Sequence, residues 1–215
     1  MDKLIVLDAN SESIKYLCNR DKRLAKVISM VGSISYRVHS DPYSFLIHEI
    51  IEQMLSLKAG QKIYERFEKS CGGNITPDAV DKLTNDEIKS IGTASSKVRS
   101  IRCITNAVVN KELFFNKFEL MSDMEVVKEL IKYYGIGMWT AKMFLIFVLD
   151  RNDVLPFEDV AFLQSYRWMY KTDDCTKVSV ENRCKKWKPY SSIAARYLYR
   201  ALDSGLTQNE FHLFK

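Results

Sequence analysis

The sequence predicts an all-α protein that contains, at most, one short strand near its start. Apolar residues recur at helical spacing along almost the whole chain after an opening apolar stretch at residues 4–8. The eight glycines and four prolines lie mostly at the ends of these periodic segments. With 215 residues, 47% hydrophobic and 27% charged, the chain is long enough to bury a core and is not typical of disorder.

Charge and cysteine usage bound the class of protein. The formal net charge of +5 is compatible with a polyanionic partner but does not identify one. No apolar run has the length that a bilayer-spanning helix needs, so we expect no membrane association. The first residues, "MDKLIVLDANSES", are too acidic and too briefly apolar for a secretory signal. The cysteine number is odd and no C-x-x-C pair occurs, which favours reduced thiols and a cytoplasmic protein over a zinc site or disulfides. The cysteines are Cys18, Cys71, Cys103, Cys175 and Cys184.

The first half of the chain predicts a series of short helices with recognisable ends. Residues 12–19 and 21–32 read as two helices, the second ending at Gly32. Asp41 is suited to cap the next helix, with Pro42 at its first position. A break is expected at residues 55–58, before a helix that runs to Glu68 and stops at the following glycine pair. The predicted buried stripe of the helix after Asp41 consists of Phe45, Leu46, Ile50 and Met54.

The second half continues this pattern. Thr76 and Thr84 each precede an acidic turn and are expected to cap two short helices. Ser95 is the expected start of a longer helix. Residues 122–150 predict a helix, a tight glycine turn and another helix. The further helices are expected at residues 160–170 and, as a pair, within residues 175–205.

The glycine turn is the first candidate site. Gly135 and Gly137 flank Ile136 between two predicted helices. Glycine tolerates positive φ and lets another backbone approach closely. The helix that follows presents unpaired N–H groups and a partial positive charge, so the turn is suited to bind one phosphate of a nucleic acid. The alternative is purely structural: Gly135 caps one helix and Gly137 eases the turn.

Longer sequence motifs favour a DNA-binding site over a purely structural turn. The stretch "GIGMWTA" (135–141) resembles the helix-hairpin-helix of the HhH-GPD DNA glycosylase superfamily, and most closely its alkylpurine branch, of the bacterial 3-methyladenine DNA glycosylase II type. Three more stretches resemble motifs of that branch in the same order, and the resemblance covers about residues 15–205. They are "FLIHEIIEQMLS" (45–56), "IGTASSKVRSI" (91–101) and "WKPYSSIAARYLY" (187–199).

The resemblance implies two helical lobes with a cleft between them. Residues 1–30 would form an N-terminal extension with the first helix, and residues 31–215 the glycosylase domain. Within that domain, one lobe is a helical barrel with the hairpin at about 125–150, and the second lobe is built from the chain ends. The leading β-rich domain of the resembled enzyme is expected to be missing or reduced to residues 4–8.

The resemblance also implies a catalytic residue, Asp159, which follows Leu155-Pro156 and begins a helix. Hydrolysis of an N-glycosidic bond develops positive charge on the sugar, and a nearby carboxylate stabilises it or activates water. The alternative is that Asp159 only caps the helix at 160–170. Glu158 is the competing carboxylate, and it points elsewhere on a helix.

Other site residues follow from the same resemblance. The base pocket would be lined by Trp139, Tyr199, Met143 and Tyr190, although Met143 equally fits a core position. The residue that fills the gap left by base flipping would be Leu55, with Met54 as the alternate. The predicted DNA-binding residues are Gly135, Ile136, Gly137, Thr140, Lys142, Leu55, Met54, Gln53 and Ser56. The basic side chains that could contact phosphates, or be simply solvated, are Lys58, Lys97, Arg99, Lys142 and Arg196.

The expected activity is a monofunctional glycosylase that removes alkylated purines from double-stranded DNA and leaves an abasic site. Bifunctional relatives carry a lysine where this chain has Trp139, so no strand cleavage is expected. Cys175 and Cys184 lack iron–sulfur spacing, so no cofactor is expected, and a monovalent cation at the hairpin is left open. We expect a monomer in the cytoplasm of a bacterial-type cell, associated with the nucleoid. The alternatives are a glycosylase for oxidised or deaminated bases and a helix-hairpin-helix DNA-binding protein without catalysis.

Overall fold

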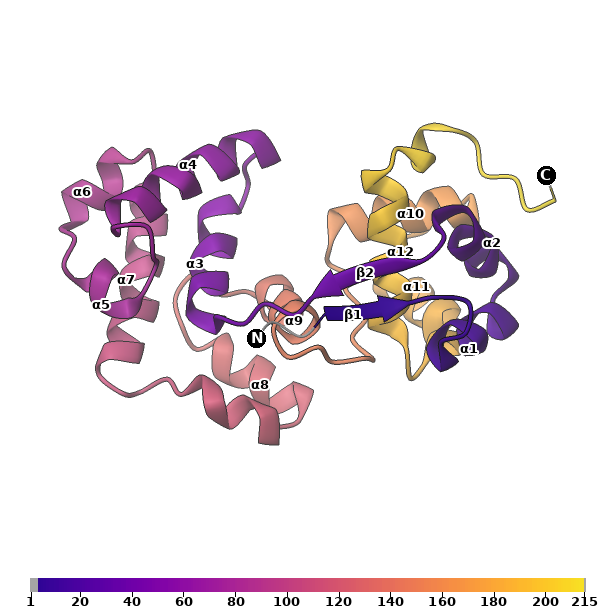
Figure 1. Cartoon of the computed structure of the whole chain (residues 1–215), viewed down its shortest axis with the longest axis horizontal. Helices are drawn as coiled ribbons and strands as arrows, with labels where there is room; N and C mark the ends of the chain where they lie inside the picture. Colours follow the sequence, from indigo (N-terminus) through magenta and orange to yellow (C-terminus); the bar gives the residue numbers. More distant parts are fainter. Residues whose placement is uncertain (1–3, 215) are drawn as a thin grey trace. The chain divides into compact units, whose positions relative to one another are not determined.

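The computed structural model describes residues 4–214 and divides the chain into two compact units (Figure 1). Unit 1 consists of Met1–Val38 together with Asp150–Lys215, and unit 2 consists of His39–Leu149. Helices dominate both units, as the sequence predicts, and the sheet has only two strands. Among the described residues, the longest helix has 15 residues, and none is long and apolar enough to cross a membrane.

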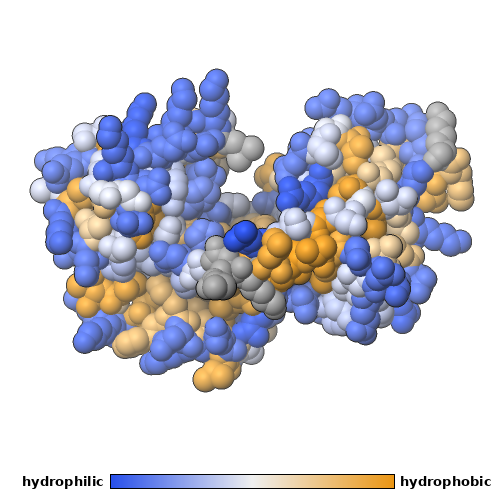
Figure 2. Space-filling model, in the orientation of Figure 1, coloured by the Kyte–Doolittle hydropathy of each residue, from blue (hydrophilic) through white to orange (hydrophobic). Residues whose placement is uncertain are grey.

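Unit 1 opens with the predicted strand β1 (Leu4–Leu7), which pairs antiparallel with β2 (Ile34–Arg37). Strand β2 was not predicted, because an alternation of only four residues cannot be distinguished from a loop in the sequence. Leu4 and Val6 are exposed on one face of β1. Figure 2 shows apolar residues on the surface in the region of this strand. The register pairs Leu4 with Arg37 and Leu7 with Ile34.

Helices make up the rest of unit 1. They are α1 (Glu12–Arg20), α2 (Lys22–Val31), α10 (Val160–Tyr170), α11 (Lys177–Cys184) and α12 (Ser191–Asp203), with short 3-10 turns η2 (Lys185–Trp187) and η3 (Leu206–Gln208). Both predicted N-terminal helices are present, and Gly32 ends α2 with a φ of 76°. The core lies where α12 packs against α10 and α2.

A buried carboxylate organises this core. Asp21 caps α2 through the amides of Arg23 (3.0 Å) and Leu24 (3.3 Å), and it accepts a hydrogen bond from the Nε1 of buried Trp187 at 2.9 Å. Tyr170 also donates its hydroxyl to this carboxylate. Burial opposes the charged form of Asp21, but these donors and the Lys186 ammonium outweigh it and lower the pKa of Asp21. Trp187, part of one family-like motif, is therefore a core residue that holds α2.

Unit 2 is entirely helical within its described residues. Its helices are α3 (Pro42–Glu52), α4 (Leu57–Ser70), α5 (Pro77–Asp81), α6 (Asn85–Ser90), α7 (Ser95–Val109), α8 (Asp123–Leu130) and α9 (Met138–Phe147), with the 3-10 turn η1 (Phe115–Leu120). Asp41 caps α3 as predicted, and Thr84 forms a full capping box with Glu87. The predicted break between α3 and α4 is confirmed, and α4 ends at Ser70, two residues beyond the predicted end.

One part of the predicted stripe of α3 is wrong. Phe45, Leu46 and Ile50 are buried, whereas Met54 lies beyond the helix end and is fully exposed. Its φ of 59° is in the left-handed region, which a non-glycine residue rarely adopts. The helical period therefore stops at Glu52, and Met54 projects from the turn that follows.

His48 on α3 makes the stability of the protein pH-dependent. Burial opposes charging of its ring, but Glu49 and Glu52, the latter 3.3 Å from Nε2, outweigh this effect and raise the pKa of His48. A raised pKa contributes stability that is complete below the unfolded value, about 6.5, and is lost as the pH rises through the folded pKa.

We therefore expect the free energy of unfolding of the wild type, relative to His48→Gln, to fall between about pH 5 and about pH 9. Because the side chain is 35% exposed, the expected loss is only about 0.5 kcal/mol. Urea unfolding of both proteins across this range measures it. A difference that grows with pH would contradict the assignment.

Candidate nucleic-acid interface and catalytic carboxylate

The hairpin between α8 and α9 needs its first glycine for two reasons. Gly135 has a φ of 88°, which disfavours any side chain. A Cβ atom there would lie 2.0 Å from the Oγ of Ser100 on α7, so the turn packs directly against that helix. Ile136 turns its side chain into the core, and its amide donates to Tyr133 O at 3.1 Å. Gly135 and Ile136 thus shape and anchor the turn.

Neither backbone conformation nor packing within the described residues requires a glycine at position 137. Gly137 has a φ of −97°, which any residue adopts, and a Cβ atom there would meet nothing within 4 Å among the described residues. Gly137 is the N-cap of α9, and no described side chain caps this helix. The turn therefore presents backbone at the positive end of a helix, with open space in front of its glycine.

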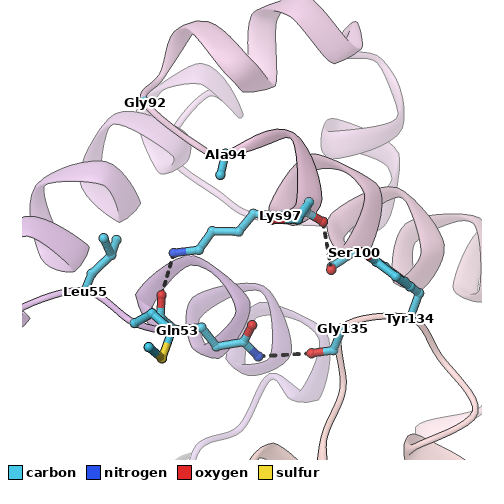
Figure 3. Close-up of a pocket in the computed structure, with 10 residues that line it drawn as sticks. Gln53, Leu55, Gly92, Ala94, Lys97, Ser100, Tyr134 and Gly135 are labelled. Carbon is cyan, nitrogen blue, oxygen red and sulfur yellow. Dashed lines mark hydrogen bonds between the residues drawn. The ribbon is translucent and has the colours of Figure 1, made fainter.

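Gln53 connects the hairpin to the turn after α3. Its Nε2 donates to Gly135 O at 3.0 Å (Figure 3). The same nitrogen lies 3.4 Å from the Oγ1 of buried Thr140. Gln53 and Thr140 are predicted to bind DNA, and in the structure both side chains support the hairpin. Ser56, another predicted DNA-binding residue, is exposed and caps α4 through the amide of Ala59 at 3.4 Å.

A pocket of about 630 Å³ lies in unit 2 beside these elements. Its lining residues are Gln53, Met54, Leu55, Gly92, Ala94, Ser96, Lys97, Ser100, Tyr134 and Gly135. Three of the family-like stretches, far apart in the sequence, thus meet at one pocket. Its lining has no carboxylate, histidine or cysteine, so its chemistry suits binding rather than acid–base catalysis.

Two of the basic candidates have partners within the chain. The Lys97 ammonium donates to Gln53 O at 2.8 Å (Figure 3). It also donates to Ile51 O at 2.6 Å, which ties α7 to the end of α3. Burial lowers the pKa of Lys97. Arg196 is buried in unit 1, 3.7 Å from the ring centre of Tyr36 and 3.6 Å from Asp150.

The other three basic candidates differ in their exposure. Lys58 and Arg99 are exposed, and Lys142 on α9 is half-buried. Arg99 stacks over the ring of Tyr134 next to the hairpin, with 4.0 Å between the guanidinium carbon and the ring centre. The ring holds this cation at the rim of the pocket.

Asp159 begins α10 in unit 1. Its Oδ1 accepts a hydrogen bond from the amide of Phe162 at 2.7 Å. Asp159 is therefore the N-cap of α10, as the structural alternative predicts. Its own amide donates to Pro156 O at 3.0 Å. Asp159 is only 8% exposed, whereas Glu158 is half-buried. A carboxylate that is shielded from bulk water and fixed at a helix start is suited to stabilise positive charge.

The other acids near Asp159 have structural partners. Asp150 accepts from the hydroxyl of Tyr36 at 3.1 Å, and Asp153 accepts from the hydroxyl of Ser191 at 2.5 Å. These pairs were not predicted, because the two members of each pair are distant in sequence. Both acids hold the segment before α10.

The predicted aromatic residues are divided between the units. Trp139, in the first turn of α9, is half-buried in unit 2, as are Tyr199 and Tyr190 in unit 1. The ring of Tyr190 meets the ring of Tyr16 edge-on, with 5.4 Å between centroids. Met143 is 4% exposed, so the alternative of a core position describes it better than a pocket role.

A tight glycine turn between two helices, packed on a third helix, makes this chain a helix-hairpin-helix protein. Residues 47–189 match the family described as HhH-GPD superfamily base excision DNA repair protein. Because this match spans most of the chain, the chain belongs to that superfamily.

The names of individual proteins that are similar to this chain agree with the description of the family. The Schizosaccharomyces pombe protein named DNA-3-methyladenine glycosylase 1 is 29% identical over 195 residues, which cover 86% of this chain and 84% of that protein. The crystal structure of a Bacillus halodurans DNA-3-methyladenine glycosidase, 29% identical, matches with a TM-score of 0.85 over 97% of each chain. A 3-methyladenine DNA glycosylase of S. pombe in complex with abasic DNA, 26% identical, matches with a TM-score of 0.83 over 90% of this chain and 97% of its own.

Proposed function

We propose that this protein is a monofunctional DNA glycosylase of base-excision repair. It hydrolyses the N-glycosidic bond of alkylated purines in duplex DNA and leaves an abasic site. The observation that carries this proposal is Asp159, a buried carboxylate fixed at a helix start in a chain of this superfamily. The full-length similarity to proteins named 3-methyladenine glycosylases supports the substrate class.

In this proposal, Asp159 acts on an extruded nucleotide. As the bond to the base breaks, the sugar gains oxocarbenium character, and the carboxylate stabilises the positive charge. The same carboxylate orients the attacking water or accepts its proton. The hydrogen bond from Phe162 N to Asp159 Oδ1 keeps the carboxylate in one orientation before the substrate arrives.

The hairpin binds the DNA backbone. The first turn of α9 offers amides to a phosphate, and Gly137 leaves room for it to approach. Lys142, Lys58 and Arg99 supply the positive charge around this contact. This binding is independent of sequence, as a repair enzyme requires, because phosphates carry no sequence information.

We assign the wedge that fills the gap after extrusion to Met54 rather than to Leu55. Both residues line the pocket, but Met54 is fully exposed and held at a φ of 59°, whereas Leu55 is only 39% exposed. Strained backbone is retained where function requires it, and an unbranched apolar side chain suits insertion between base pairs.

Met54→Ala is therefore expected to slow excision of a base-paired lesion about tenfold, because extrusion loses the side chain that replaces the base. Leu55→Ala is the matched comparison and should cost about threefold or less. Single-turnover excision from the same duplex measures both. A larger loss in Leu55→Ala would return the wedge to Leu55.

Tyr199 and Tyr190, which belong to unit 1 as Asp159 does, are the proposed aromatic contacts of the extruded base, and Trp139 of unit 2 stays a prediction from the family resemblance. Electron-poor alkylated purines are attracted to electron-rich ring faces in the way that cations are. Trp139 also occupies the position of the lysine of bifunctional relatives, so no amine is available there for a Schiff base.

A monovalent cation at the hairpin is also part of the proposal. The hairpin offers backbone carbonyls rather than carboxylates, and each carbonyl has a second lone pair beyond the hydrogen bond it already accepts, as Gly135 O does from Gln53. Such neutral oxygen donors suit a singly charged ion. Affinity for abasic duplex in potassium compared with a bulky organic cation tests this at constant ionic strength.

The experiment that tests the function is release of free base from methylated duplex DNA, separated by chromatography, with strand integrity followed on a gel. The proposal expects free methylated purines and intact strands that break only after alkali. Release only from duplexes with oxidised or deaminated bases would support the second glycosylase class. Binding without release would support the non-catalytic DNA-binding protein.

A further inference from the structure

The segment that leads to Asp159 is fastened to the first turn of α12. Residues 150–159 join α9 to α10, and Ser192 makes the main attachment. The Ser192 amide donates to Asn152 O at 2.9 Å. Its hydroxyl accepts from Val154 N at 2.9 Å and lies 3.3 Å from Val154 O. One buried serine thus forms hydrogen bonds with backbone groups of both Asn152 and Val154.

Flanking contacts reinforce this attachment. The hydroxyl of Ser191 donates to Asp153 at 2.5 Å, and Asp150 is held by Tyr36 and Arg196. The attachment is shielded from solvent, since Ser192 is 2% exposed and Val154 is 6% exposed. In such surroundings, an N–H group that loses its acceptor destabilises the local structure.

The hydroxyl of Ser192 does nothing for its own helix. The N-cap of α12 is Tyr190, and no side-chain hydrogen bond caps this helix among the described residues. Alanine would be the better helix former at this position. The serine is therefore explained by the segment that it holds, not by α12.

We infer that Ser192 is a positioning residue for Asp159. The inference rests on the proposed function of Asp159. Fixing Asn152 and Val154 sets the start of the short path to Pro156, whose carbonyl accepts the Asp159 amide at 3.0 Å. Without the hydroxyl, the segment shifts to find other partners, and the carboxylate moves with it. A displacement of about 1 Å at a reacting group costs on the order of a hundredfold in rate.

The test compares Ser192→Ala with Thr105→Ala. Thr105 is an equally buried hydroxyl in unit 2, where it bonds to Ile101 O at 2.7 Å and to the hydroxyl of Tyr43 at 2.8 Å. Both variants are expected to lose stability. Only Ser192→Ala should slow single-turnover excision, by about 30- to 100-fold, with affinity for abasic duplex unchanged within about threefold.

A second readout does not depend on activity. The Phe162 amide donates to Asp159 Oδ1, so its hydrogen exchange reports the position of the carboxylate. Relative to the Tyr166 amide in the same helix, it should exchange about tenfold faster in Ser192→Ala and unchanged in Thr105→Ala. If the wild type releases no base, the proposed function fails, and this readout still decides whether Ser192 positions Asp159.

Asp153→Ala covers the case in which Ser192→Ala does not fold. It removes the acceptor of Ser191 and the carboxylate that lies 3.8 Å from the Lys188 ammonium, at a side chain that is 30% exposed. We expect about a tenfold slower excision with unchanged affinity for abasic duplex. The inference is overturned if the foldable variant keeps the wild-type rate and the relative exchange of Phe162, or if Thr105→Ala slows excision equally.

Discussion

Asp159→Asn is expected to reduce the single-turnover rate of base release by about a thousandfold, because the amide cannot offset the positive charge that develops on the sugar. The fold should persist. Asparagine is as good an N-cap as aspartate, so its Oδ1 can still accept from the Phe162 amide. The measurement is excision from a duplex with one alkylated purine, with enzyme in excess.

Glu158→Gln is the matched control for this variant, since it removes the neighbouring carboxylate at a half-buried position. It should excise at the wild-type rate within about threefold. Both variants should bind abasic duplex as the wild type does. Retained excision in Asp159→Asn, or a large loss in Glu158→Gln, would remove Asp159 from its proposed role.

Substitutions of the two hairpin glycines are expected to have different effects: one lowers stability and the other lowers DNA affinity. Gly135→Ala should lower the free energy of unfolding by about 3 kcal/mol, from strain at positive φ and from the clash with the Ser100 Oγ. Replacing Ser100 by glycine in the same chain should restore the part that is due to the clash. Urea denaturation measures both contributions.

Gly137→Ala should leave stability within about 0.5 kcal/mol, because its φ suits alanine and the new Cβ atom meets no described atom. Its affinity for abasic duplex should fall at least about tenfold, since the methyl group occupies the approach of the phosphate. Equal loss of stability and affinity would mean that Gly137 only shapes the turn.

The helix ends were predictable because their signals are local. Asp41, Thr76 and Thr84 cap helices through amides two or three residues ahead, so the short stretches contain all the information. Met54 was mistaken for core because helical spacing continues past Glu52 in the sequence, while the chain leaves the helix there. Helix propensity does not predict such a helix end when no glycine or proline marks it.

The parts of the site that depend on distant partners were not predictable. A lysine such as Lys97 reads as a surface charge until the carbonyls at the end of α3 are seen to accept from it. The role of Ser192 likewise depends on its hydrogen bond with Val154, which is 38 residues away in the sequence. The role of Asp159 came from the family resemblance, since its local pattern indicates a cap, which it is. The cytoplasmic location and the monomeric state stay predictions.

The most direct measurement compares two duplexes that differ by one charge at the abasic position. One carries neutral tetrahydrofuran, and the other a pyrrolidine ring whose ammonium mimics the developing cation. We expect the wild type to bind the pyrrolidine duplex at least about a hundredfold more tightly, and Asp159→Asn to lose that preference while it keeps its affinity for the neutral duplex. An undiminished preference in Asp159→Asn would show that another group faces the sugar, and would contradict the account.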